Sequence, residues 1–320
     1  MRINVQLLQK LEETIDVLYP EKGTVPINIL GYGEISLVFE LKGEEGIAYK
    51  RLPIFEDETQ VTRHVKAYEI YQNQILENKI GIHIPPFDSV WFKTADNKIT
   101  LYCAQEKLPP ESIGNKVIHQ VSKQEVQTLI LLIMREMKKL WTFNNKNKTL
   151  KVGLDGQISN WALVGYDFNN PSVDEDSQLL YLDTSTPFFR FKGVEALEAD
   201  LFLKSAPSFL RWLLKALFVQ EVLDRYYNWR LVIIDLLANF YKEQRPELIP
   251  GSIRTVNEFF SNEASEFQIA PLSLEEVHSY YQNDKMIWVV FQNSRKIDRY
   301  LQTRMLRRKY AFYLPDKIER

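Results

Sequence analysis

Residues 25–52 read VPINILGYGEISLVFELKGEEGIAYKRL, and this stretch decides the fold class of the chain. Short apolar runs alternate with glycines and charged residues, which is the pattern of antiparallel strands joined by tight turns. We predict two or three strands here, with a turn at Lys42–Gly46. A helix is predicted at Glu56–Asn78, and two more strands are predicted at Ser89–Lys93 and Ile99–Ala104.

The chain changes character after Pro109 and Pro110, which interrupt the strand pattern. Most of the remaining text is typical of helices, with a small hairpin among them. The main predicted segments are helices at Lys123–Trp141, Leu210–Tyr226 and Trp229–Glu243, and short strands at Leu150–Leu154, Trp161–Val164 and Leu179–Leu182. This order predicts a bilobal α+β fold, with a small antiparallel sheet and one key helix in residues 1–108 and a larger helical lobe in residues 109–320.

The composition excludes several classes of protein. The 320 residues include 40 Lys and Arg against 42 Asp and Glu, a formal net charge of −2. No nucleic-acid partner is expected, because such proteins usually carry a strong basic excess. Cys103 is the only cysteine, which excludes an intrachain disulfide and a cysteine-based zinc site. No run approaches the ~18 uncharged apolar residues of a membrane span, so a cytoplasmic protein is expected.

Four features in chain order carry the side chains needed for phosphoryl transfer from ATP. The run Gly31–Ser36 (GYGEIS) lies between two predicted strands, where glycines let backbone N–H groups approach a phosphate. Lys50 ends a strand and would supply a fixed cation. Asp155 and Asn160 form an Asp-x4-Asn between strand-like runs, and Asp183 follows an apolar strand. Asn160 and Asp183 would bind Mg²⁺, and Asp155 would orient or deprotonate the acceptor.

A carboxylate that holds the Lys50 ammonium is also expected on the helix that follows it. Glu69 lies on the apolar face of that predicted helix, together with Val61, Val65 and residues further along. Glu58 shares the face and is the alternative partner.

These motifs, taken together, resemble those of the protein-kinase-like superfamily, in particular its aminoglycoside phosphotransferase and choline kinase branch. The resemblance covers about residues 24–190 as an ordered set of short motifs. ILGYGEISLVFEL resembles the loop that covers the nucleotide, IAYK the strand with the phosphate-binding lysine, and AYEIYQ the helix with its glutamate. GLDGQISNWAL is similar to the catalytic loop, and LLYLDTSTP to the strand that ends in the second metal-binding aspartate.

The resemblance implies a Mg²⁺–ATP-dependent phosphotransferase, with ATP between a nucleotide-binding N-terminal lobe and a catalytic C-terminal lobe. Asp155 would be the base, and Asn160 and Asp183 the metal ligands. LYCAQEKLPP resembles the hinge strand that holds adenine. The implied nucleotide-binding residues are Gly31, Gly33, Glu34, Ser36, Lys50, Gln105, Glu106 and Leu108.

The chain also departs from the family pattern. Ser36 replaces the third glycine of the phosphate loop, Gly153-Leu154 replace the histidine before the catalytic aspartate, and Thr184-Ser185 follow Asp183. Helical text resumes by about Glu195, which leaves little room for a long activation segment and favours a hydroxyl of a small molecule as acceptor. Two alternatives remain: a pseudokinase that senses nucleotide or docks a protein partner, and a nucleotidyl (AMP) transferase.

A basic segment closes the chain. Residues 295–320 hold nine Lys and Arg against three Asp and Glu. We expect a helix with a solvated basic face, on which Tyr300, Leu301, Met305 and Leu306 pack inward. The alternative is contact with an acidic partner, a nucleic acid or a membrane surface.

Overall fold

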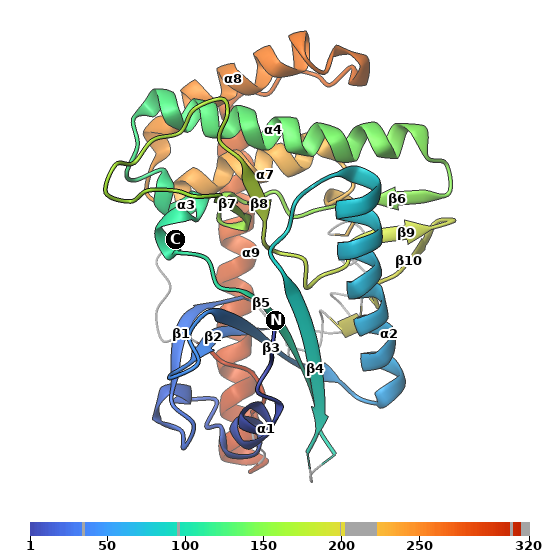
Figure 1. Cartoon of the computed structure of the whole chain (residues 1–320), viewed down its shortest axis with the longest axis vertical. Coiled ribbons are helices and arrows are strands. Elements are labelled where there is room, and N and C mark those ends of the chain that lie inside the picture. The colour runs from blue at the N-terminus through green and yellow to red at the C-terminus, as the bar shows by residue number, and fades with distance from the viewer. Residues whose placement is uncertain (34–35, 95–96, 199, 202–222, 308–309, 315–320) are drawn as a thin grey trace.

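The computed structural model describes residues 1–33, 36–94, 97–198, 200–201, 223–307 and 310–314. Figure 1 shows two lobes, one built on an antiparallel sheet and the other on a group of helices. The predicted α+β fold class, with a small sheet-containing N-terminal lobe and a larger, mainly helical C-terminal lobe, is confirmed.

The N-terminal lobe is built on a five-stranded antiparallel sheet with the order β1-β2-β3-β5-β4. Its strands are β1 (Ile27–Tyr32), β2 (Leu37–Leu41), β3 (Ile47–Phe55), β4 (Phe87–Lys93) and β5 (Ile99–Glu106), which confirms the strands expected from the sequence. The chain reverses between β2 and β3 through Gly43 and Gly46, whose φ angles are 87° and 108°. Only glycine adopts such angles at low cost, which explains why the predicted turn contains glycine at both positions.

Two helices cover the two faces of this sheet: α1 (Val5–Thr14) and α2 (Glu58–Glu69). Successive side chains of a strand point to opposite faces, and β5 shows this directly. Tyr102 and Ala104 pack in one apolar cluster with α1, whereas Leu101 and Cys103 pack in another with α2. The predicted helix after the first strands is confirmed, since α2 continues through π-helical turns (η2, Ile70–Ile80) to Gly81.

A buried ion pair joins α1 to the sheet. Arg51 on β3 donates from Nε and Nη2 to the Glu12 carboxylate, at 2.8 Å and 2.7 Å, and both side chains are about 95% buried. Thr100 Oγ1 and the Tyr102 hydroxyl also donate to this carboxylate. Burial alone would raise the pKa of Glu12, but the charge and hydrogen bonds of Arg51 outweigh it and hold that pKa below its usual value.

The C-terminal lobe contains the longer helices and several short strands. Among the described residues its helices are α3 (Gly114–Val117), α4 (Lys123–Lys146), α7 (Trp229–Lys242), α8 (Ile249–Asn262) and α9 (Leu274–Tyr300). Short helical turns in this lobe are η3 (Pro110–Ser112), η4 (Ile158–Asn160), η6 (Pro246–Leu248), η7 (Ser265–Phe267) and η8 (Leu301–Met305), and η1 (Pro20–Lys22) follows α1 in the N-terminal lobe. Its strands are β6 (Leu150–Val152), β7 (Trp161–Leu163), β8 (Leu179–Tyr181), β9 (Phe189–Phe191) and β10 (Val194–Glu195). The predicted helix Leu210–Tyr226 lies largely outside the described residues.

Capping boxes fix where the two longest helices begin. Ser122 caps α4, and Ser273 caps α9; in each case the carboxylate of a glutamate three residues later accepts a hydrogen bond from the backbone N–H of the cap. This Ser-x-x-Glu spacing satisfies backbone donors that a helix start otherwise leaves unpaired. The predicted hairpin is formed by β7 and β8, with Trp161 opposite Tyr181, whereas β6 pairs with β9.

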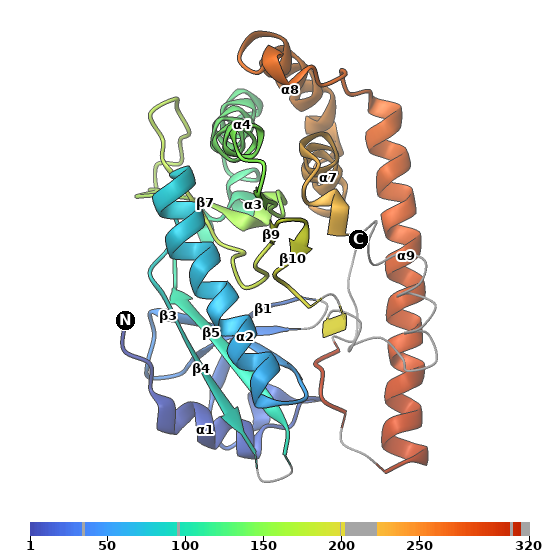
Figure 2. The same cartoon turned by 90° about the vertical axis from the view of Figure 1, so that its right-hand side faces the viewer.

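Helix α9 reaches from one lobe to the other. It packs against α7 in the C-terminal lobe, and Figure 2 shows it running beside the full length of the molecule. The chain then returns to the sheet: Arg51 Nη1 donates to the Ala311 carbonyl at 3.2 Å, and Arg295 Nη2 donates to the Tyr313 carbonyl at 3.3 Å.

The expected inward packing of the basic segment is wrong for three of its four residues, while Leu301 is partly buried. Tyr300, Met305 and Leu306 are 62%, 68% and 54% exposed, and the side chain that α9 buries in this region is that of Arg295. No helix among the described residues is long and apolar enough to cross a membrane.

Candidate functional site

One row of residues crosses the sheet and contains two of the predicted site residues. Gly31 of β1 pairs with Val38 of β2, Val38 with Lys50 of β3, and Lys50 with Cys103 of β5. Residues opposite each other in a ladder point to the same face, so Lys50 lies on the α2 face with Cys103. Gly31 is two strands away, a separation of about 10 Å from the usual strand spacing.

The glycine run forms the turn between β1 and β2. The Gly33 N–H donates to the Ser36 carbonyl at 3.0 Å, and Ser36 is buried. A Cβ at Gly33 would lie 2.8 Å from the Ser36 hydroxyl oxygen, so a larger residue here would require the Ser36 side chain to shift. Glu34 lies outside the described residues.

Lys50 and Asp183 form the centre of the candidate site, although 133 positions separate them in the chain. Lys50 Nζ lies 2.8 Å from Asp183 Oδ1, and both side chains are about three-quarters buried. The Ser185 hydroxyl also donates to Asp183 Oδ1, at 3.2 Å. The sheet of the first lobe and the strand β8 of the second therefore meet at this ion pair.

The predicted glutamate partner of Lys50 is wrong. Glu69 is exposed, and the Glu58 carboxylate lies on the surface, 3.3 Å from Lys93 Nζ. The polar side chains that α2 and η2 bury are those of His64 and Gln72. The Thr184 hydroxyl donates to Gln72 Oε1 at 2.7 Å, so this helix holds the residues around Asp183 by neutral hydrogen bonds.

His64 is a residue of this region that the sequence did not single out. Its Nε2 lies 3.1 Å from the Ser185 carbonyl oxygen, which requires the proton on Nε2 in the neutral ring. Burial, assisted by the nearby charge of Lys50, lowers the pKa of His64 to about 4. The imidazole is therefore neutral near pH 7 and adds no charge beside Lys50.

The loop between β6 and β7 carries Asp155 and Asn160, and hydrogen bonds join it to β8. Asn160 Nδ2 donates to the Asp155 carbonyl at 3.1 Å, and the Leu182 N–H donates to the Asn160 carbonyl at 2.8 Å. Asn160 is thus tied to the residue next to Asp183. These hydrogen bonds therefore place Asp155, Asn160 and Asp183 near one another.

Two tyrosines hold this loop in place. The kinase-like pattern that the sequence resembles would have a histidine just before Asp155. The Tyr71 hydroxyl donates to the Gly153 carbonyl at 2.8 Å, and the Asp155 N–H donates to the Tyr181 hydroxyl at 3.1 Å. Both tyrosines are fully buried. A Cβ at Gly153 would lie 2.7 Å from the Tyr226 carbonyl oxygen, so glycine is needed for the chain to pass this close.

The Asp155 carboxyl lies in a strongly perturbed electrostatic environment. Its withdrawal from water, and then the negative charges of Asp235 and Asp183, raise the pKa of Asp155 to about 7. Asp235 is 3% exposed and lies on α7, where it accepts a hydrogen bond from Gln157 Nε2 at 3.3 Å. The sequence pattern did not single out Asp235; the only signal is a carboxylate inside the otherwise apolar run Leu231–Ala238.

Replacing Asp155 with Asn is expected to stabilise the metal-free protein at alkaline pH. The raised pKa means that the folded state binds the Asp155 proton more tightly than the unfolded state does, so this carboxyl reduces stability as pH rises from about 4 to about 7. We expect a gain of about 1–3 kcal/mol at about pH 8 and almost none at about pH 4.5. Denaturant unfolding of both proteins, with the exposed Asp176→Asn as control, measures it. A difference that does not grow with pH contradicts this electrostatic account.

Asn160 and Asp183 fit a magnesium ion by the chemistry of their donor atoms. Carboxylate and amide oxygens are the hard ligands that Mg²⁺ prefers. Because the Asn160 amide nitrogen already donates to the Asp155 carbonyl, the amide oxygen is the atom left for a metal. No group of three or more His, Cys, Asp or Glu gathers in the described part of the chain, so phosphate and water oxygens would complete the coordination.

The predicted adenine-binding residues continue from β5 into the connection between the lobes. Gln105 Nε2 donates to the Leu182 carbonyl at 2.9 Å, which joins this connection to the strand before Asp183. The Glu106 N–H donates to the Pro86 carbonyl. Leu108 makes no backbone hydrogen bond through its N–H to any described residue, so its backbone is the better candidate for contact with a base.

Gly114→Ala is expected to displace the turn that positions Asn160. A Cβ at Gly114 would lie 2.4 Å from the Ile158 carbonyl oxygen, at the start of η4. Since backbone must move to relieve this overlap, we expect a loss of about 1–3 kcal/mol in the free energy of unfolding. Gly31→Ala is the control, because its Cβ would meet no atom within 4 Å. Equal unfolding midpoints for wild type and Gly114→Ala contradict the prediction.

One comparison with known protein families places the chain. The profile of a family described as "Family of unknown function (DUF6206)" matches residues 10–299, which include both lobes and every residue of the candidate site. No curated protein matches the chain.

Proposed function

This chain belongs to the DUF6206 family of unknown function, and we propose that it is a Mg²⁺–ATP-dependent phosphotransferase acting on a hydroxyl group of a small molecule. The observation that carries the proposal is the 2.8 Å contact between Lys50 and Asp183, beside the loop with Asp155 and Asn160. A cation, two metal-binding oxygens and a carboxylate with a raised pKa are the groups that phosphoryl transfer needs.

Each residue has a role that follows from its position. Bound Mg²⁺ would supply positive charge to the phosphate oxygens, with Asn160 and Asp183 as its protein ligands. Lys50 would leave Asp183 and bind phosphate oxygens, so the present ion pair keeps its ammonium close to where it is needed. Asp155 would accept the proton of the attacking hydroxyl, and a pKa near 7 lets it do so at neutral pH.

The short connection after Asp183 favours a small acceptor. Strand β9 begins at Phe189, soon after Asp183, and β10 ends at Glu195. The chain between Asp183 and β9 is too short for the long ordered segment that binds a peptide in protein kinases. A small-molecule hydroxyl is therefore the acceptor class that we propose.

A nucleotide-sensing pseudokinase is the second candidate, and a specific observation favours it. Helix α2 and its continuation η2 present neutral His64 and Gln72 where a carboxylate partner for Lys50 was expected. Without that carboxylate, the position of the Lys50 ammonium depends on Asp183 itself. Such a site would bind nucleotide and report its presence to a protein partner without transferring phosphate.

Calorimetric titration with ATP, with and without Mg²⁺, tests the proposal on wild type and Asp183→Asn. Wild type is expected to need Mg²⁺ for tight binding, and Asp183→Asn to bind about tenfold or more weakly, because one metal ligand loses its charge. The exposed Asp176→Asn is the matched control. ATP affinity that is the same with and without Mg²⁺, and the same in Asp183→Asn, supports the nucleotide-sensing alternative. No binding of ATP by wild type contradicts both functions.

A further inference from the structure

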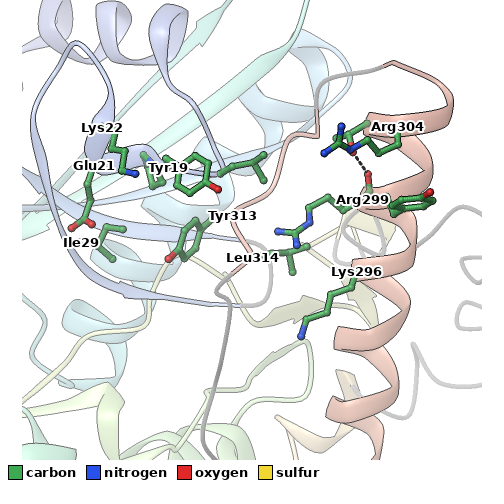
Figure 3. A pocket seen from close by; sticks show the side chains of 13 residues that line it. Tyr19, Glu21, Lys22, Ile29, Lys296, Arg299, Arg304, Tyr313 and Leu314 are labelled. Carbon is green, nitrogen blue, oxygen red and sulfur yellow. Dashed lines mark hydrogen bonds between the residues drawn. The ribbon is translucent and has the colours of Figure 1, made fainter.

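A cavity lies outside the candidate site, between the sheet and the end of α9. It has a volume of about 540 Å³, within the range of small-molecule sites. Figure 3 shows its walls, which come from the turn after α1, from β1, from α9 with η8, and from the returning chain. Ile29 and Tyr313 in its wall pack against the α1 side of the sheet, whereas Lys50 lies on the opposite face. The cavity and the Lys50–Asp183 pair are therefore separate.

The walls of this cavity are strongly basic. Four cationic side chains line it, against one carboxylate, that of Glu21: they are Lys22, Lys296, Arg299 and Arg304. In Figure 3, Lys22 and Arg299 extend into the space from opposite walls. Within the described part of the chain, none of the four forms an ion pair with a carboxylate, and the nearest partner of Lys22 is the Tyr19 ring, 4.7 Å from its Nζ.

Four converging cations, with a single carboxylate among the described residues of the wall, point to an anionic ligand. Like charges that share one cavity repel each other, and a bound anion of high charge relieves this repulsion. Arginine forks match phosphate oxygens in two-point hydrogen bonds, which favours phosphate among the common anions. We propose that this cavity binds a molecule, or a lipid headgroup, that carries two or more phosphate groups.

The cavity is also linked to the glycine turn of the candidate site. The Tyr313 ring in its wall lies 5.9 Å, centre to centre, from the ring of Tyr32, which stands between Gly31 and Gly33. A ligand held by Lys22 on one side and Arg299 on the other would also fasten α9 to the sheet. The proposal itself does not depend on the function proposed for the Lys50–Asp183 site.

Binding of inorganic tripolyphosphate, measured by calorimetry, tests the proposal on the full chain. Two double variants remove two cations each: Lys296→Gln with Arg299→Gln on α9, and Lys22→Gln with Arg304→Gln on η1 and η8. Each is expected to weaken binding about tenfold, and added salt should weaken binding to wild type. Since the two variants change different elements, misfolding of one leaves the other as a test.

Two controls separate this cavity from other sources of binding. Lys66→Gln with Lys148→Gln removes the same charge from exposed positions elsewhere and should leave the affinity within about twofold. Lys50→Met tests whether tripolyphosphate binds at the candidate ATP site instead: binding that is lost in Lys50→Met and kept in both cavity variants contradicts the proposal. If neither cavity variant weakens binding, or the control weakens it equally, the proposal is wrong.

Vesicles distinguish the two sources of phosphate. Phosphatidylcholine vesicles with and without phosphatidylinositol bisphosphate are sedimented with wild type and with both cavity variants. Sedimentation that needs the bisphosphate and is lost in the cavity variants supports a lipid headgroup as ligand. Binding of tripolyphosphate alone, lost in the same variants, supports a soluble phosphorylated molecule. Absence of binding to both probes overturns the proposal.

Discussion

Asp155→Asn is expected to lower ATP-dependent turnover by about 10²- to 10⁴-fold, the usual contribution of a positioned general base. Asn has nearly the same size and keeps an oxygen for the Gln157 N–H, which donates to Asp155 Oδ1 at 3.2 Å. The loop, and with it Asn160, should therefore stay in place. Phosphate transfer is measured with a hydroxylated acceptor identified by screening, and nucleotide affinity is measured alongside.

Nucleotide affinity is the readout that separates a base from a structural residue. We expect the affinity of Asp155→Asn for ATP to stay within about threefold of wild type, because the base acts on the acceptor. Asp176→Asn, on an exposed turn, should match wild type in both measurements. Normal turnover by Asp155→Asn on a proven acceptor would show that another group accepts the proton. Transfer of AMP rather than phosphate to a target would establish nucleotidyl transfer instead.

Glu12→Ala is expected to reduce the free energy of unfolding by about 3–5 kcal/mol, because it leaves the buried Arg51 guanidinium without its counter-charge. Arg51 is 5% exposed, and Glu12 accepts its two closest hydrogen bonds, so water cannot replace the lost carboxylate. Thr100 and Tyr102 lose an acceptor as well. Denaturant unfolding at neutral pH measures the loss.

The neighbouring exposed residue gives the matched control for this prediction. Glu13→Ala makes the same substitution at the exposed neighbouring position and should change the free energy of unfolding by no more than about 0.5 kcal/mol. The pKa of Glu12 is lowered, so its stabilising contribution is present at neutral pH and lost in acid, as pH falls through that lowered value. The difference between wild type and Glu12→Ala should therefore shrink in acid. A constant difference, or equal losses for both variants, contradicts the role of the ion pair.

The face that α2 presents to Lys50 shows how far a local pattern can be trusted. Steps of four residues rotate by about 40° each on an α-helix, so Glu69 lies about 80° around the axis from Val61. His64 and Tyr68 lie closer to the buried side, and they are the residues that pack against the sheet. The rotation of α2 about its own axis is set by how it packs against the sheet. The spacing of apolar residues therefore predicts its buried face only approximately.

The end of α9 was mispredicted for a related reason. Arg295 is 1% exposed, between the rings of Phe291 and Phe312 at 5.5 Å and 5.9 Å, while Tyr300 points to solvent. A charged residue is ordinarily assigned to the surface and an aromatic one to the core. The chain that returns after α9 supplies the Phe312 ring and the Tyr313 carbonyl that accepts a hydrogen bond from Arg295. The sequence of α9 alone does not predict these contacts.

Features that depend on neighbouring residues could be predicted from the sequence. Alternating apolar residues predicted the strands of the sheet, glycines predicted the turn before Ile47, and the order of short motifs selected Lys50, Asp155 and Asp183. The folded chain was needed to see that Lys50 pairs with Asp183, and that α2 buries His64 rather than Glu69. It was also needed to see that basic side chains from both ends of the chain surround one cavity. Such contacts join residues far apart in sequence, and they are fixed by how whole elements pack together.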